Sequence, residues 1–126
     1  MIEVEGLTKR YGNARGITDI SFSIKEGEIV GFLGPNGAGK STTMNIITGY
    51  ISATSGSAKI AGIDIFEDPI GAKRRIGYLP EQPPLYMDMT VDEYLGFVYD
   101  LKGVRAKSAA EHIGEVADLV GITDVR

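Results

Sequence analysis

Residues 34–42, Gly-Pro-Asn-Gly-Ala-Gly-Lys-Ser-Thr, fit the pattern G-x-x-x-x-G-K-[ST] of a phosphate-binding loop. Glycines in such a loop let successive backbone N–H groups turn towards a phosphate, because no Cβ stands in the way. The pattern predicts a nucleoside triphosphate site in which Lys40 reaches the β- and γ-phosphates and the Ser41 hydroxyl binds Mg²⁺. The residues predicted to hold the phosphates are Gly34, Asn36, Gly37, Ala38, Gly39, Lys40, Ser41 and Thr42.

The residues on either side of this loop predict the strand and the helix that the pattern requires. Residues 28–33 form an almost unbroken apolar run, which is typical of a strand buried on both faces of a parallel sheet. After the loop, Met44 and Ile47 fall on one face of a helix that Gly49 would end. This context disfavours the alternative, a glycine-rich turn that only caps a helix. The predicted fold class is therefore α/β, with a P-loop NTPase core.

Composition limits the remaining possibilities. The chain has 126 residues, of which 43% are hydrophobic and 24% charged, as expected for a globular domain. Its net charge of −4 gives no general attraction for nucleic acid, so we expect no nucleic-acid partner. It contains no cysteine, no apolar run of the ~20 residues that span a membrane, and no signal-peptide pattern. We therefore expect a cytoplasmic protein.

Short strands are predicted in the first half of the chain. Residues 20–25 alternate strictly between apolar and polar side chains, which indicates a strand with one buried face. Ile2, Val4 and Leu7 indicate a weaker companion strand. Residues 58–63 are typical of a hairpin that turns at residues 61–62. Together these strands predict an antiparallel β layer beside the parallel strand.

The second half is predicted to be mainly helical. Asp68 and Pro69 are a favourable cap and first turn for a short helix to Arg75, and residues 76–79 read as a further strand. Residues 90–93 and 108–111 both fit the capping box, and each precedes apolar residues at helical spacing. His112 falls in the second of these helices, away from any nucleophile or metal-ligand spacing, and is expected to be structural.

The chain as a whole resembles the nucleotide-binding domain of ATP-binding cassette (ABC) transporters. The resemblance rests on residues 6–12, 26–33, the phosphate-binding loop, and residues 76–81 with 85–86 and 89–91. It implies that residues 1–126 are the N-terminal part of one such domain. Residues 1–83 would then form the β layer and P-loop core, and residues 84–126 the start of a helical subdomain.

The resemblance also implies roles for residues outside the loop. Tyr11 occupies the place of the aromatic side chain that stacks on adenine, and we expect it to do so here. The alternative for Tyr11 is an amphipathic residue at a strand edge. Glu81 stands where the family has its Q-loop glutamine, and Gln82 follows it. We expect Glu81 to bind Mg²⁺, and Lys40, Glu81 and Gln82 to serve catalysis. The alternative for Glu81 and Gln82 is a solvated loop. Residues 82–87 are expected to contact a membrane subunit, and the Leu-Pro-Glu sequence favours exporters.

Several parts of the family pattern are missing from these residues: the Ser-Gly-Gly-Gln signature, the Walker B segment and the switch histidine. We therefore expect a truncated piece that hydrolyses ATP negligibly alone, in which residues 29–33 lack ladder partners. The whole protein would pair two cassettes head to tail on the cytoplasmic face of a membrane and drive a separate transporter subunit. Alternatives are a non-hydrolysing regulatory module and a non-transport ABC ATPase. A GTPase is disfavoured because there is no Asn-Lys-x-Asp guanine reader.

Overall fold

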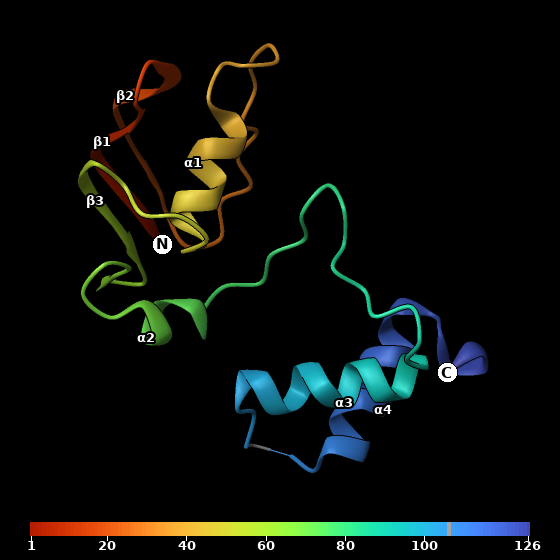
Figure 1. The fold of residues 1–126 in the computed structure, drawn as a ribbon. Helices are drawn as coiled ribbons and strands as arrows, with labels where there is room; N and C mark the ends of the chain where they lie inside the picture. Colours follow the sequence, from red (N-terminus) through yellow and green to blue (C-terminus); the bar gives the residue numbers. More distant parts are fainter. Residues whose placement is uncertain (106) are drawn as a thin grey trace. The chain divides into compact units, whose positions relative to one another are not determined.

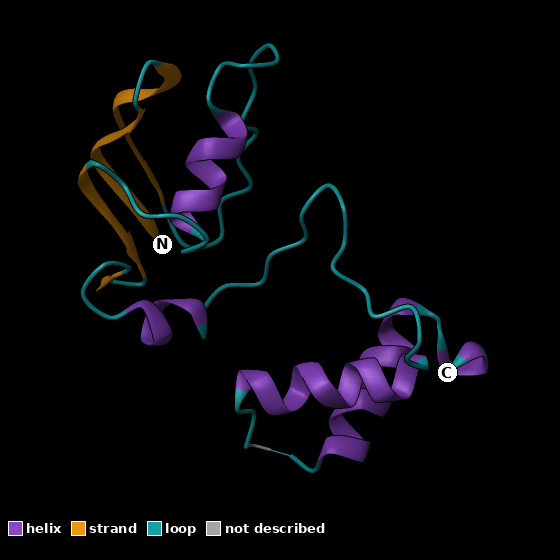
Figure 2. Cartoon of the chain, viewed as in Figure 1, coloured by secondary structure: helices purple, strands orange, loops and turns teal. Residues whose placement is uncertain are grey.

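The computed structural model describes residues 1–105 and 107–126, which divide into two compact units, Met1–Tyr78 and Leu79–Arg126 (Figure 1). Strands and two helices make up the first unit, and the second consists of helices and loops (Figure 2). The predicted α/β class is thus confirmed. The division predicted at residue 83 concerns the domain of the whole protein and stays a prediction.

The sheet of the first unit is antiparallel throughout its described part. Its strands are β1 (Ile2–Tyr11), β2 (Ala14–Ile24), β3 (Ser55–Ile60) and β4 (Ile63–Asp64), in the spatial order β2-β1-β3-β4. The predicted antiparallel layer is therefore confirmed. Ile20, Phe22 and Ile24 of β2 are half-buried while the serines between them are exposed, which is the alternation that predicted this strand.

The pairing of β1 with β2 is irregular near the hairpin. Lys9 pairs with Ile17 and Tyr11 with Ala14, so three steps along β2 match two steps along β1. An extra residue of this kind is a β-bulge, which bends the strand and changes where its side chains point. The bulge lies at Arg15 and Gly16.

The hairpin of β3 and β4 turns where the sequence predicts. Ile60 pairs with Ile63, and the two residues between them, Ala61 and Gly62, have φ of +50° and +79°. Positive φ at both central residues is the type I′ geometry, which matches the twist of the flanking strands. The prediction of a turn at residues 61–62 is confirmed.

Helix α1 (Lys40–Ile47) packs on β2 and β3 and closes the core of the unit. Its buried side chains are Thr43, Ile46 and Ile47, whereas Met44 is 37% exposed. Ile47 is therefore buried as predicted, whereas the prediction for Met44 is wrong, because its neighbour Thr43 takes the buried position. Gly49 follows the helix with φ +75°, as predicted for its end. The remaining core residues are Val4, Leu7, Ile17, Ala58, Ile60, Ile65 and Ala72.

Helix α2 (Pro69–Lys73) begins as predicted: the Asp68 carboxylate accepts a hydrogen bond from the Gly71 N–H at 2.9 Å.

The strand predicted at residues 28–33 is wrong for this chain. The segment has no regular secondary structure, and Ile29 and Leu33 are 102% and 94% exposed. A strand needs a neighbouring strand for its N–H and C=O groups, and no described segment pairs with this one. The expected lack of ladder partners thus leaves an exposed apolar segment instead of a parallel strand. Residues 76–79 likewise form no strand, for the same reason.

The second unit contains α3 (Val91–Lys102), α4 (Ala109–Val120) and the 3₁₀ turn η1 (Thr123–Val125). The capping box at the start of α3 is confirmed: Thr90 Oγ1 accepts from the Glu93 N–H at 3.3 Å, and the Glu93 carboxylate accepts from the Thr90 N–H at 2.7 Å. The hydrogen bond from the Thr90 N–H, and one from the Thr90 side chain, favour the ionised carboxylate and lower the pKa of Glu93 below its usual 4.5. At α4, the Ser108 hydroxyl accepts from the Glu111 N–H at 3.3 Å, the first bond of the predicted second box.

No helix in the described part of the chain is both long enough and apolar enough to cross a membrane.

Candidate functional site

The loop ahead of α1 depends on two glycines with left-handed backbone conformations. Gly37 has φ +82° and Gly39 has φ +95°, which side chains with a Cβ rarely adopt. The Ala38 N–H donates to the Pro35 carbonyl at 3.1 Å and closes the turn between them. A Cβ on Gly39 would stand only 2.4 Å from Ile17 Cγ2 of β2. The loop therefore brings the start of α1 directly against β2.

The first turn of α1 offers unpaired amides. None of the described side chains caps this end of the helix, and the Thr43 N–H is bonded to the Gly39 carbonyl at 2.9 Å. The N–H groups of Lys40, Ser41 and Thr42 precede that bond and have no carbonyl one turn back within the helix. Such amides, together with the positive end of the helix dipole, attract an anion.

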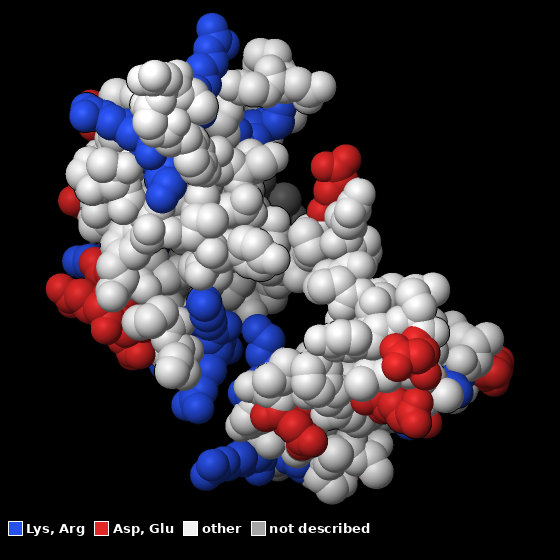
Figure 3. Space-filling view, in the orientation of Figure 1, with Lys and Arg blue, Asp and Glu red and all other residues white. Residues whose placement is uncertain are grey.

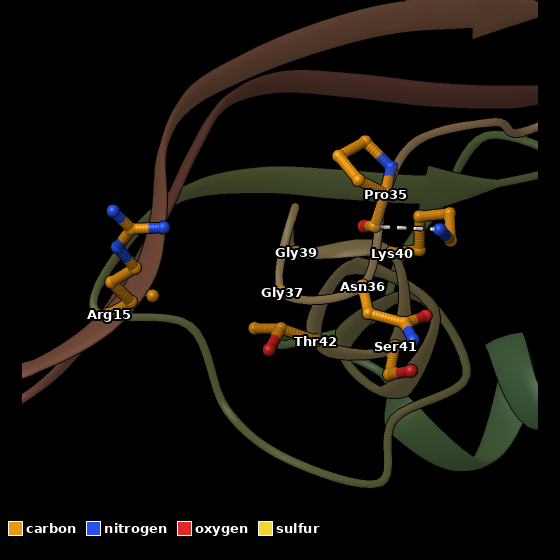
Figure 4. Close-up of a pocket in the computed structure, with 9 residues that line it drawn as sticks. Arg15, Pro35, Asn36, Gly37, Gly39, Lys40, Ser41 and Thr42 are labelled. Carbon is orange, nitrogen blue, oxygen red and sulfur yellow. Dashed lines mark hydrogen bonds between the residues drawn. The ribbon is translucent and has the colours of Figure 1, made fainter.

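The Lys40 side chain folds back over the loop. Its ammonium donates one hydrogen bond to the Gly34 carbonyl. It donates a second, at 3.3 Å, to the Pro35 carbonyl, drawn as a dashed line in Figure 4. The positive charge thus lies beside the same turn that presents the amides.

These groups surround a cavity of about 270 Å³. One wall is the loop and the first turn of α1, and the other is β2 at its bulge (Figure 4). None of the described residues that line the cavity is acidic. Its lining consists of Arg15, Gly16, Pro35, Asn36, Gly37, Gly39, Lys40, Ser41 and Thr42. Amides, two cations, and the hydroxyls of Ser41 and Thr42 are the groups that bind phosphate and its Mg²⁺.

Most of the predicted phosphate-binding residues meet at this cavity. Gly34 and Ala38 are the exceptions: the Gly34 carbonyl holds Lys40, and Ala38 closes the turn. Tyr11 ends β1 outside the cavity lining, 41% exposed, with the Lys9 ammonium 5.5 Å from the centre of its ring. Its predicted role in adenine stacking stays a prediction, as do the individual roles of the loop residues.

Glu81 and Gln82 belong to the second unit, where both are exposed. The structure therefore leaves their predicted roles as Mg²⁺ ligand and catalytic residues as predictions. Three apolar side chains follow them on the surface, Leu85, Tyr86 and Met87, and Met87 is 89% exposed. The Tyr86 ring packs edge-on against Phe97 of α3, with centroids 5.6 Å apart, so this segment is anchored to the helices of its own unit.

Sequence reasoning missed the contribution of β2 to the cavity. Arg15 and Gly16 line it, yet neither belongs to a motif. A β-bulge leaves no pattern of residue types here, because the residues around it alternate poorly. The place of these two residues beside the loop depends on how β1 pairs with β2.

The chain resembles known proteins in sequence. The family model described as ABC transporter matches residues 17–126. An uncharacterised ABC transporter ATP-binding protein of Bacillus subtilis is 39% identical over 97% of the chain, and the linearmycin resistance ATP-binding protein of the same species is 39% identical over 98%. The bacitracin transport ATP-binding protein of Bacillus licheniformis is 38% identical over 97%. The chain spans only 39% to 40% of the length of these curated relatives.

Solved structures agree with this assignment. The structure of an ATP-binding subunit of an ABC transporter matches 83% of the chain, with 33% identity and a TM-score of 0.77. A bacterial ABC transporter cassette, solved as a dimer, matches all of it with 27% identity and a TM-score of 0.81. The chain covers 44% and 58% of these two structures.

Proposed function

Because the chain belongs to the ABC transporter family, we propose that it is part of an ATP-binding subunit that couples ATP binding and hydrolysis to transport through a separate membrane subunit. The observation that carries the proposal is the uncapped start of α1, which faces a cavity with two cations and no acidic side chain among its described lining. This arrangement suits the triphosphate of ATP and its Mg²⁺.

Each group at the cavity has a separate task in this proposal. The amides of Lys40, Ser41 and Thr42 bind phosphate oxygens, and the Lys40 ammonium offsets their charge. The Ser41 hydroxyl is a ligand of Mg²⁺, which supplies further positive charge to the phosphates when it is bound. Tyr11 offers its exposed ring to the adenine. These residues bind and orient the nucleotide.

The second unit supplies the link to other subunits. Glu81 is proposed as a further Mg²⁺ ligand and Gln82 as a residue that orients the attacking water, because a carboxylate suits Mg²⁺ and an amide can hold water. The exposed apolar side chains of Leu85, Tyr86 and Met87 suit contact with the membrane subunit. We further propose a head-to-tail pair of cassettes on the cytoplasmic face of the membrane. A dimer was found for the bacterial cassette that this chain resembles.

Export is the proposed direction of transport. The Leu-Pro-Glu sequence of residues 79–81 favours it, and the names of the relatives for linearmycin resistance and bacitracin transport are compatible with it.

The test of ATP binding is a titration of the whole protein with Mg-ATP, followed by calorimetry, for the wild type and Lys40→Ala. Loss of a charge-assisted contact to phosphate should weaken binding by about 10- to 100-fold. Lys59→Ala is the control, because it removes the same charge from an exposed position on β3. Wild-type protein that does not bind ATP, or a Lys40 variant with unchanged affinity, would contradict the proposal.

A further inference from the structure

We propose that the Arg15 guanidinium is a second cationic contact for the phosphate chain of the nucleotide, opposite Lys40. The inference rests on the proposed function, since it assigns a further residue to the same cavity. Arg15 stands on the strand wall of that cavity, across from the loop and the first turn of α1 (Figure 4). Basic side chains are exposed at this end of the first unit (Figure 3).

The β-bulge sets the direction of Arg15. In a regular strand, Arg15 and the buried Ile17 would share a face. The extra residue between the pairs Tyr11–Ala14 and Lys9–Ile17 breaks this alternation, and Arg15 is exposed while Ile17 is 4% exposed. Bulges beside binding sites commonly redirect a side chain in this way.

Close backbone packing keeps Arg15 beside the loop. A Cβ on Gly16 would lie 1.7 Å from the Lys9 carbonyl oxygen, so β1 and β2 approach each other closely at this residue. On the other side, Gly39 packs against Ile17. The backbone that carries Arg15 is therefore held between β1 and the start of α1.

Arg15 also has the charge that the site needs. The Lys40 ammonium is bonded to the Gly34 and Pro35 carbonyls, whereas the Arg15 guanidinium forms no ion pair or hydrogen bond with any described residue. A guanidinium presents a planar fork of N–H donors that matches two oxygens of one phosphate. Arg15 can thus bind a phosphate without giving up a partner within the described chain.

The experiment compares Arg15→Gln with the wild type in the whole protein, using Mg-ATP and inorganic tripolyphosphate as probes. Tripolyphosphate lacks a base and a sugar, so it reports the phosphate contacts alone, through its displacement of a fluorescent ATP analogue. Arg74→Gln is the matched control, because Arg74 is an exposed arginine of the same unit outside the cavity lining. We expect Arg15→Gln to lower the affinity for both probes by about three- to tenfold. This loss of affinity should become smaller at high salt, because the site is open to solvent.

The outcomes separate this inference from the proposed function. If Arg15→Gln lowers the affinity for both probes equally, and Arg74→Gln leaves both affinities unchanged, the phosphate contact is supported. A loss for ATP but none for tripolyphosphate would mean that Arg15 contacts the base or sugar, and it would overturn the inference. Unchanged binding of both probes would also overturn it while leaving the proposed function intact. A wild-type protein that fails to bind ATP would refute the function itself.

Discussion

Replacing Gly39 with alanine should destabilise the junction between the loop and β2, for two separate reasons. At φ +95° an alanine is held in a left-handed conformation, which costs about 1–2 kcal/mol. In addition, its Cβ would stand 2.4 Å from Ile17 Cγ2, and overpacking of this kind costs about 1–3 kcal/mol. We therefore expect Gly39→Ala to lower the local stability of the first unit by about 2–5 kcal/mol.

Gly37 provides the matched control for this prediction. It has nearly the same conformation, with φ +82°, but a Cβ there would meet no atom within 4 Å. Gly37→Ala should therefore show the conformational cost alone, about 1–2 kcal/mol. The difference between the two variants measures the clash with β2.

Native-state hydrogen exchange is the suitable assay, because it reports the opening free energy of individual amides. The amides of Ile46 and Ile47 in α1 should lose more protection in Gly39→Ala than in Gly37→Ala. If the two variants lower the opening free energy of these amides by the same amount, the contact between Gly39 and Ile17 does not hold the loop in place. Removing the clashing methyl with Ile17→Ala should reduce the additional cost of alanine at position 39, and additive effects would refute the reasoning.

The remaining predictions concern the N-cap of α3, the exposed apolar segment at residues 28–33, and the core. Thr90→Ala should destabilise α3 by about 1 kcal/mol, measured by urea unfolding, because it removes the N-cap; equal stability would show that the cap is not needed. Because the pKa of Glu93 is lowered in the folded state, the bond of its carboxylate to the Thr90 N–H stabilises α3 fully above about pH 4.5, and this stabilisation is lost as the pH falls through the lowered pKa. An NMR titration of Glu93 should therefore give a midpoint below 4.5, and Thr90→Ala should raise that midpoint. Ile29→Ser should leave the free energy of unfolding within about 0.5 kcal/mol of the wild-type value, because Ile29 is exposed. Leu7→Ala should lower it by about 2–5 kcal/mol, because Leu7 is fully buried. A large cost at Ile29 would show that this segment is packed.

Local features were predictable from the sequence wherever the physical cause lies within a few residues. The turn at residues 61–62 needs two left-handed residues between paired strands, and the capping box at Thr90 and Glu93 closes its bonds within one turn. The conformation of the loop at residues 34–42 belongs to the same class, because its glycines and the following helix define it.

Features that depend on distant partners were not predictable in the same way. The apolar run of residues 28–33 has the composition of a buried strand, but a strand also requires a neighbour, and none of the described segments supplies one. Arg15 was missed for a related reason. Its place at the cavity follows from the pairing of β1 with β2 and from the β-bulge, and the residue types in this segment do not indicate a bulge. Met44 was assigned to the buried face because helical spacing fixes a face only to within a neighbouring position.

The hydrogen bonds from Lys40 to the Gly34 and Pro35 carbonyls affect how the affinity for a phosphate should be understood. Two oxygens of the chain itself already accept from two of the three N–H donors of the ammonium, so an incoming phosphate finds one free donor and competes with the carbonyls for the other two. The strength of binding then reflects an exchange between internal and external oxygens, much smaller than the full attraction between a bare cation and a bare anion.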